Sequence, residues 1–524
     1  MGFITPQRER LQSIALDELI AQDAKCRFVV DLVERLDLQS LYARYSTQGG
    51  DAFDPKTMLA TWFFAYSEGV ASTRKLEQRC QRDLHFIYVS GNLRPDHTSL
   101  SRFRKGHLDL MADYFVELVH MAQQQACSDF SEIAIDGTKI QAAASAKKSK
   151  DTEALARYLR AVRHRIDEYM ERAQELEAND EDDDEAAAEA ALEQTRHELS
   201  RLQELETRLL ERQEQLEARK QTIKAEYRQG HQINLTDPEA CYQTGSCRVG
   251  YNAQVGVDTK TQLIVSCDVV QDRNDKQQFI AQYQQVERNL GADPARAYDL
   301  DSGYHTLETL AYIDHHGIDA VVADPTPEHR SGNPEKGPPA TVAALEAGGK
   351  RLLRSAFVYD AEADCYHCPA GEQLVFVGKR KQKRRIQRLY RASGCLVCSL
   401  KALCVKNALG LRQIYRDEQE ALAEQMSRRL EQTEARARLK RRRETVEPAI
   451  GNVKSNLGFR RFSLHSLAQV RGEFTLMCIG HNLNKLYRLL GGLFYAFYRG
   501  LEKRYKTAQQ AYQRTRRRYR LSFG

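Results

Sequence analysis

Apolar positions at helical spacing occupy the first part of the chain, over residues 8–125. The segment DPKTMLATWFFAYSEG starts with the Asp-Pro pair that favours a helix start and continues with a broad apolar face. Another helix is expected after Asp96 or Thr98, either of which can cap it, and it carries Arg102 and Arg104. Short helices with a basic face are typical of helix-turn-helix DNA readers, although a purely structural bundle gives the same pattern.

Short apolar runs bounded by turn residues follow, and they indicate strands. The first is SEIAIDGTKI at 131–140, in which Asp136 precedes a glycine. The order strand, strand, strand, helix, strand, helix, strand predicts a mixed α/β sheet of the ribonuclease-H type with flanking helices. The later strands are expected at 250–258, 262–271, 296–303 and 319–324, with helices over 275–290 and through Ile313.

An insertion with a different period separates the first strand from the second. Over residues 151–229 apolar residues step by four and three, as in a coiled-coil heptad, and the acidic run at 179–185 interrupts them. Two helical arms around a polar tip predict an antiparallel coiled-coil hairpin without a catalytic role. The seam consists of Leu155, Leu159, Val162, Ile166, Tyr169, Ala173 and Leu176 in one arm and Leu192, Leu199, Leu202, Leu209 and Leu216 in the other.

These patterns predict six units along the chain. They are a helical DNA-binding and dimerisation domain at 1–128, an α/β core at 129–150 and 230–326, the coiled coil at 151–229, a cysteine-rich zinc-ribbon-like insertion and linker at 327–430, C-terminal helices of the core at 431–490, and a basic tail at 491–524.

Composition adds limits on class and compartment. A chain of 524 residues exceeds one compact core, and 42% hydrophobic residues is an ordinary share for a globular protein. No apolar run reaches the roughly 18 residues of a membrane span, and the start lacks the layout of a signal peptide. We therefore expect no membrane association and a cytoplasmic protein whose twelve cysteines are mostly reduced.

The net charge of +6 conceals two strongly basic stretches. Residues 376–391 hold eight Lys or Arg residues and no acid, and residues 499–524 hold nine against Glu502 alone. Such local charge attracts phosphate backbones, although a solvated basic face is the alternative. Six cations of the first stretch are expected on a flexible loop that contacts phosphates rather than bases: Lys379, Arg380, Lys381, Lys383, Arg384 and Arg385.

Five cysteines cluster within residues 357–407. In a reducing compartment, two CxxC pairs predict a structural Zn²⁺ ribbon that would present the basic stretch to DNA; free thiols are the alternative. A fifth cysteine could replace Cys398. The candidates are Cys365, Cys368, Cys395, Cys398 and Cys404.

Three acids are candidates for a catalytic metal site: Asp136 on the first strand, Asp301 at the end of the fourth, and Glu447 in the late helical region. Phosphodiester chemistry commonly uses two Mg²⁺ ions about 4 Å apart, and these ions prefer carboxylate oxygens. Each acid alone is weak evidence, because an aspartate at a strand end is more often a turn residue. Asp299 lies on the same strand face as Asp301 and competes with it.

The segment RRRETVEPAIGNVK gives Glu447 a distinctive setting. Arg443, Glu447 and Lys454 stand at i, i+4 and i+11, near one helix face, so two phosphate-binding cations flank the carboxylate. A solvated ion-pair helix has the same spacing. Pro448 must either kink this helix or mark its start.

Taken in order, these motifs resemble the DDE transposases of bacterial insertion sequences, in the branch with a Tyr-Arg-Glu-Lys signature. Arg443, Glu447 and Lys454 match the signature's spacing, the strand AIDGTKI resembles that of the family's first acid, and Asp301 heads the family's Asp-x-Gly-Tyr motif. GYNAQVGVD resembles the second strand, and DPKTMLATWFFAY and PDHTSLSRFR resemble the N-terminal helical domain. Lys440 stands where the signature has the tyrosine that the family links with handling a flipped base.

The likeness spans about residues 50–140 and 230–490. It implies that Asp136, Asp301 and Glu447 bind two Mg²⁺ or Mn²⁺ ions, and that the enzyme cleaves and joins double-stranded DNA at the terminal inverted repeats of an insertion sequence. It also implies a homodimer associated with the bacterial nucleoid. The alternatives are a ribonuclease-H-fold nuclease without strand transfer and a domesticated, non-catalytic DNA-binding protein, which the presence of all three acids disfavours.

Overall fold

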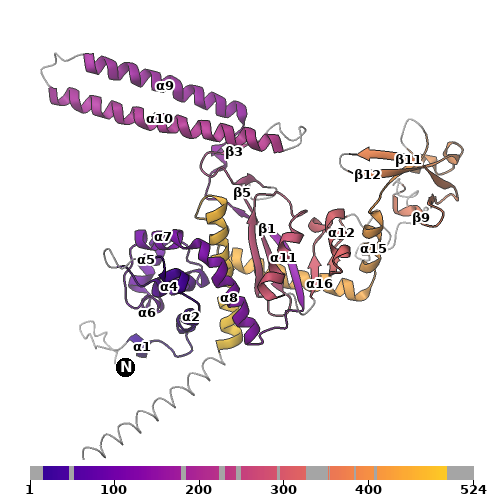
Figure 1. The fold of residues 1–524 in the computed structure, drawn as a ribbon, viewed down its shortest axis with the longest axis horizontal. Helices are drawn as coiled ribbons and strands as arrows, with labels where there is room; N and C mark the ends of the chain where they lie inside the picture. The colour runs from indigo at the N-terminus through magenta and orange to yellow at the C-terminus, as the bar shows by residue number, and fades with distance from the viewer. Residues whose placement is uncertain are drawn as a thin grey trace, which may run out of the picture.

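The computed structural model describes residues 16–45, 52–178, 185–222, 231–243, 249–291, 296–325, 352, 354–382, 385–405 and 410–491. Figure 1 shows N-terminal helices beside a central sheet, with a long helical hairpin and a second, smaller sheet extending from it. No helix within these ranges is both long and apolar enough to cross a membrane. The architecture is a mixed α/β fold, as predicted.

The central sheet combines antiparallel and parallel pairing. β5 pairs antiparallel with β1, β4 and β6, whereas β1 pairs parallel with β7, and β7 with β8. Every residue of β5 is buried, so this strand is covered on both faces. The strands are β1 (Glu132–Gln141), β4 (Cys241–Tyr242), β5 (Val249–Asp258), β6 (Ile264–Val270), β7 (Ala297–Leu300) and β8 (Asp319–Val322).

Helices from distant parts of the chain cover the sheet. α11 packs on β5 and β6, whereas α16 packs on β1, β5, β7 and β8. α16 continues directly into a π-helical turn, Asn452–Asn456. The helices concerned are α11 (Phe279–Leu290), α12 (Leu307–His315), α15 (Glu420–Leu430) and α16 (Thr433–Gly451).

The N-terminal region is helical, as the apolar spacing predicts. Asp54 caps α4 by accepting from the backbone N–H of Thr57, with Pro55 at the first helical position. Asp96 caps α7 by accepting from Thr98 and Ser99, so Asp96 rather than Thr98 is the cap. The helices are α1 (Leu16–Leu19), α2 (Lys25–Val33), α3 (Gln39–Tyr42), α4 (Pro55–Ser67), α5 (Thr73–Arg82), α6 (Leu84–Val89), α7 (His97–Gly106) and α8 (Met111–Gln124).

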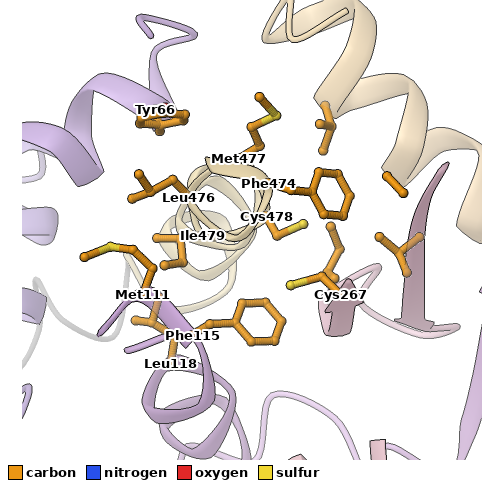
Figure 2. Close-up of a cluster of buried hydrophobic side chains, with 14 of the residues drawn as sticks. Tyr66, Met111, Phe115, Leu118, Cys267, Phe474, Leu476, Met477, Cys478 and Ile479 are labelled. Atoms are coloured by element: carbon orange, nitrogen blue, oxygen red, sulfur yellow. The ribbon is translucent and has the colours of Figure 1, made fainter. Parts of the chain in front are cut away.

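A buried helix over residues 467–491 joins these helices to the sheet. Figure 2 shows it between Met111 and Phe115 of α8 on one side and Cys267 of β6 on the other, so one apolar core is continuous across both regions. The side-chain amide of Asn482 accepts a hydrogen bond from Ile264 N–H at 2.9 Å and donates one to Ile264 C=O at 2.7 Å. These are the two backbone groups that a neighbouring strand would otherwise bind. This closes part of an otherwise open sheet edge.

His481 on this helix is fully buried and hydrogen-bonded as a neutral ring. Its Nε2–H donates to the Gln262 carbonyl at 2.8 Å, and its Nδ1 accepts from the Asn452 amide at 3.0 Å. Burial, with help from nearby Lys485 and Arg488, lowers the pKa of His481 from 6.5 to about 4.

We expect acid to destabilise the protein through His481. Because the pKa is lower in the folded state, the stabilisation is complete above pH 6.5 and is lost as pH falls toward 4, where the unfolded chain takes up the proton first. Between pH 6.5 and 5 the loss is about 2 kcal/mol. The measurement is the free energy of unfolding of the wild type and of His481→Gln, obtained from thermal unfolding at a series of pH values. We expect it to fall more steeply with decreasing pH in the wild type. Equal slopes would contradict the assignment of this pH dependence to His481.

The insertion predicted as a coiled coil is formed by α9 (Thr152–Ala178) and α10 (Glu185–Thr222), which project from the sheet in Figure 1. A two-stranded pair at its base, β2 (Ser149–Lys150) with β3 (Ile233–Asn234), brings the two ends together. The buried seam contains most of the predicted positions: Leu155, Leu159, Val162, Ile166, Leu202, Leu209 and Leu216.

The cysteine-rich segment forms an antiparallel sheet in the order β13-β12-β11-β10-β9 with its own apolar core. Lys379, Arg380 and Lys381 lie on β11 and Arg385 is the first residue of β12, so the expectation of a flexible loop is wrong for these four residues. Lys383 and Arg384 lie outside the described residues. The elements are β9 (Val358–Asp360), β10 (Cys365–His367), β11 (Gln373–Gln382), β12 (Arg385–Ala392), α14 (Lys401–Cys404) and β13 (Gln413–Asp417).

Candidate active site

The register of two parallel strands places Asp136 beside Asp301. Ile135 of β1 pairs with Leu300 of β7, and each is followed directly by one of the two aspartates. Neighbouring strands lie about 4.8 Å apart, so adjacent residues after a paired position remain close. Asp301 also caps the following 3-10 turn by accepting from Gly303 N–H at 2.8 Å, which orients its carboxylate.

Asp136 is a half-buried carboxylate among several charges. Its Oδ2 lies 2.8 Å from a guanidinium nitrogen of Arg442, and its Oδ1 accepts from Gly137 N–H at 2.8 Å. The pKa of Asp136 is raised to about 6: burial is the main cause, Asp301 and Asp275 add to the rise, and Arg442 opposes it. The carboxylate therefore lies where burial and two neighbouring acids disfavour its charged form, an environment that is common at functional sites.

Asp275 is a third acid of this cluster. Its Oδ1 accepts from Gln254 at 2.6 Å and from Asn252 at 2.8 Å, two buried side chains of β5, and lies 3.5 Å from Lys139 Nζ. Glycine at 137 makes this approach possible, because a Cβ there would lie 2.4 Å from Asp275 Oδ1.

Helix α16 and the π-helical turn after it each place a cation on strand β1. Arg442 reaches Asp136, and Lys454 on the π-helical turn donates to Thr138 Oγ1 at 2.9 Å and to the Lys139 carbonyl at 3.0 Å. Glu447 lies between these two anchors in sequence and is exposed. The stretch of α16 that packs on β1 therefore carries Glu447 as an exposed residue, five positions after Arg442.

Pro448 neither starts the helix nor ends it. α16 begins at Thr433 and runs through the proline to Gly451, so the expectation that Pro448 marks a helix start is wrong. A proline inside a helix removes one backbone hydrogen bond, and the π-helical turn begins four residues later. Such turns often occur at functional sites, and this one carries Lys454.

Asp299 has a different environment from Asp301. It is fully buried, and its Oδ1 accepts from Arg438 Nε at 2.8 Å. The same arginine also reaches Asp319 at 3.0 Å. Burial raises the pKa of Asp299 to about 7, with Glu132 adding to the rise and Arg438 opposing it. These contacts tie α16 to the sheet and give Asp299 a structural role.

Four polar residues of this site are not predicted from the sequence: Asp275, Arg442, Asn252 and Gln254. Asn252 and Gln254 left a signal, because two polar residues alternate within an otherwise apolar strand. Asp275 precedes α11 in a polar segment without a distinguishing pattern.

The two arginines expected to bind DNA in the N-terminal region differ in exposure. Arg102 is exposed on α7, whereas Arg104 is buried. Arg104 donates to Tyr66 Oη at 3.1 Å and to the Ala71 carbonyl at 2.9 Å, and stacks over Trp62. Its guanidinium therefore stabilises the helical core, which makes its assignment as a DNA contact wrong.

The five cysteines of the second sheet divide into two groups. Cys368, Cys395, Cys398 and Cys404 line one pocket, and backbone N–H groups of Glu372 and Arg412 each lie 3.3 Å from a sulfur, on Cys368 and Cys395 respectively. Burial raises the pKa of Cys404, and the other three cysteines add to the rise.

Cys365 faces elsewhere, with Asp360 and His367. In the described ranges, these three donor atoms are the group that lies within 4.8 Å of one another. In the same ranges, no three of the four pocket sulfurs lie within 4.8 Å of one another. Cys404 thus takes the place of Cys365, rather than of Cys398, in the candidate tetrad.

Comparisons with known families match two parts of the chain. The model described as a transposase DDE domain matches residues 367–487, and the model described as a transposase domain, DUF772, matches residues 14–106. The first contains α16, and the second contains the N-terminal helices α1 to α7. No curated protein matches the chain.

Proposed function

This chain belongs to the DDE transposases of insertion sequences. We propose that Asp136, Asp301 and Glu447 hold divalent metal ions on a ribonuclease-H-like sheet. We further propose that this site cleaves and rejoins DNA at terminal inverted repeats. The observation that carries the proposal is the Ile135–Leu300 register, which sets Asp136 beside Asp301. The sheet pairing, antiparallel for β6, β5 and β1 and then parallel for β7 and β8, supports the fold assignment.

The donor set fits a hard divalent cation. A DDE transposase uses divalent metal, and carboxylate oxygens are the ligands preferred by Mg²⁺ and Mn²⁺. A pair of such ions would supply an activated oxygen nucleophile and stabilise the leaving oxygen. Asp136 and Asp301 would be ligands from the sheet and Glu447 the ligand from α16.

The chain's own cations have positioning roles. Arg442 holds the Asp136 carboxylate at 2.8 Å, and Lys454 is held against β1 at Thr138. Arg443, four residues before Glu447, and Lys454 would contact phosphates of the DNA that approaches Glu447. Lys379, Arg380, Lys381 and the exposed Arg102 would add backbone contacts farther away. Joining two transposon ends requires two sites, which favours a homodimer.

We also propose a structural Zn²⁺ held by Cys368, Cys395, Cys398 and Cys404. The support is the shared pocket and the N–H groups directed at two of the sulfurs, which favour thiolates. Four cysteines in a cysteine-rich module are the usual ligands of a closed zinc site.

A cleavage and strand-transfer assay tests the main proposal. The DNA flanking the coding region supplies candidate inverted repeats, and duplexes ending in them are incubated with the full chain and Mg²⁺ or Mn²⁺. We expect nicking at the repeat end and joining of the freed 3′-OH to a target duplex. Cleavage without joining would indicate a nuclease, and repeat binding without either step would indicate a non-catalytic DNA-binding protein.

A further inference from the structure

A basic concavity lies where the coiled coil meets the sheet. Its volume is about 550 Å³, and its walls come from α9, α10 and the segments around β2 and β3. Six cations line it and no acid does: Lys147, Lys148, Lys150, Arg157, Arg208 and Arg212. Tyr158 and Leu205 add an aromatic and an apolar surface between them.

These six cations differ from other cations of α9 and α10. Arg163 pairs with Glu206, Arg201 with Glu198 and Lys220 with Glu217. Within the described residues, none of the six lining cations forms an ion pair with a carboxylate, and Arg212 Nε is buried without a hydrogen-bond partner. Clustered like charges repel one another and attract a polyanion.

We propose that this concavity binds the phosphate backbone of the duplex DNA that the transposase cuts. The inference rests on the proposed function, because it takes the DNA engaged at Asp136 as the ligand. Lys147 follows Asp136 by eleven residues, so the chain keeps them within about 40 Å. A separation of that size is roughly one helical turn of B-DNA. One duplex can therefore contact both the concavity and the site at Asp136.

The ligand is a backbone rather than a base sequence. Six positive charges around one hollow match the close spacing of DNA phosphates, about one charge per 1.7 Å of helix axis. Lysine and arginine contacts of this kind position a duplex without reading it.

Salt-dependent binding tests the proposal. The triple variant Lys148→Gln/Arg157→Gln/Arg208→Gln removes three exposed cations of the concavity, and Arg165→Gln/Arg172→Gln/Arg201→Gln removes three exposed cations elsewhere on the coiled coil. Anisotropy of a labelled 30-base-pair duplex (a length of roughly three turns) is measured in EDTA across a KCl series. We expect the first variant to lose about 0.9 unit of log–log slope per contact, and at least about tenfold in affinity, with little change in the control.

Three results would overturn the proposal. One is unchanged slope and affinity in the concavity variant, and another is an equal loss in both variants, which would show a general charge effect. A third is unchanged DNA affinity with weakened binding of poly-glutamate, which would point to an acidic protein partner. Because EDTA prevents cleavage, these results stand apart from the cleavage assay, and wild-type cleavage survives if only the concavity assignment fails.

Discussion

Asp301→Asn is expected to lower cleavage of transposon-end DNA by at least about 1000-fold, whereas Asp299→Asn retains cleavage. Loss of a carboxylate that holds metal removes several kcal/mol of transition-state stabilisation, and about 4 kcal/mol corresponds to that factor. Asp136→Asn and Glu447→Gln are expected to behave like Asp301→Asn. All three should bind DNA as wild type does, because the amide keeps the side-chain shape.

Asp299→Asn serves as the matched control, since it makes the same chemical change two residues away. It weakens the buried contact with Arg438, so we expect a lower melting temperature but activity below that temperature. Single-turnover cleavage at 20 °C (about the temperature of maximal stability of many proteins), paired with thermal unfolding, separates the two effects. Active Asp301→Asn with inactive, folded Asp299→Asn would reverse the assignment.

Freshly purified, reduced protein is expected to contain one zinc per chain, and Cys404→Ser is expected to lose it. Thiolate zinc sites contribute about 10–16 kcal/mol of binding free energy to folding at pH 7. Metal removal should therefore unfold the second sheet, which hydrogen exchange detects as lost protection over β10 to β12 while the central sheet stays protected.

Cys365→Ser is the control for the zinc site, because Cys365 lies near Asp360 and His367 instead of the pocket. It should keep the zinc. Loss of zinc from Cys365→Ser with retention in Cys404→Ser would show that the first CxxC pair binds intact. Absence of zinc from the wild type would remove the metal from this sheet altogether.

The central elements were predictable because each carries a strong local signal. The strand over 250–258 coincides with β5 within one residue, and the heptad seam of 151–229 corresponds to α9 and α10. The position of Asp301 before Gly-Tyr favours it over Asp299 as the catalytic acid, and this choice stays a prediction. Apolar period and turn residues are local properties, so one sequence reveals them.

The partners within the site were less predictable because they depend on tertiary geometry. Arg441, Arg442 and Arg443 are consecutive, and the charge pattern alone does not reveal which faces the sheet. Packing decides it: Arg442 lies one turn after Arg438, so both point at β1 and β7. The choice of Cys404 over Cys365 depends likewise on strand β10, whose alternation turns Cys365 toward His367.

The β2–β3 pair at the base of the coiled coil has a consequence for folding kinetics. Roughly 110 residues separate the end of β1 from the start of its partner β5, and closing so long a loop is slow. The coiled coil forms from contacts local to the insertion, and once Lys150 and Ile233 meet, only about 25 loop residues remain to be ordered. The saving in closure entropy is about 1.3 kcal/mol, close to a tenfold gain in the rate at which β1 finds β5. We therefore expect the coiled coil and the β2–β3 pair to form before β1 pairs with β5 and to speed that pairing.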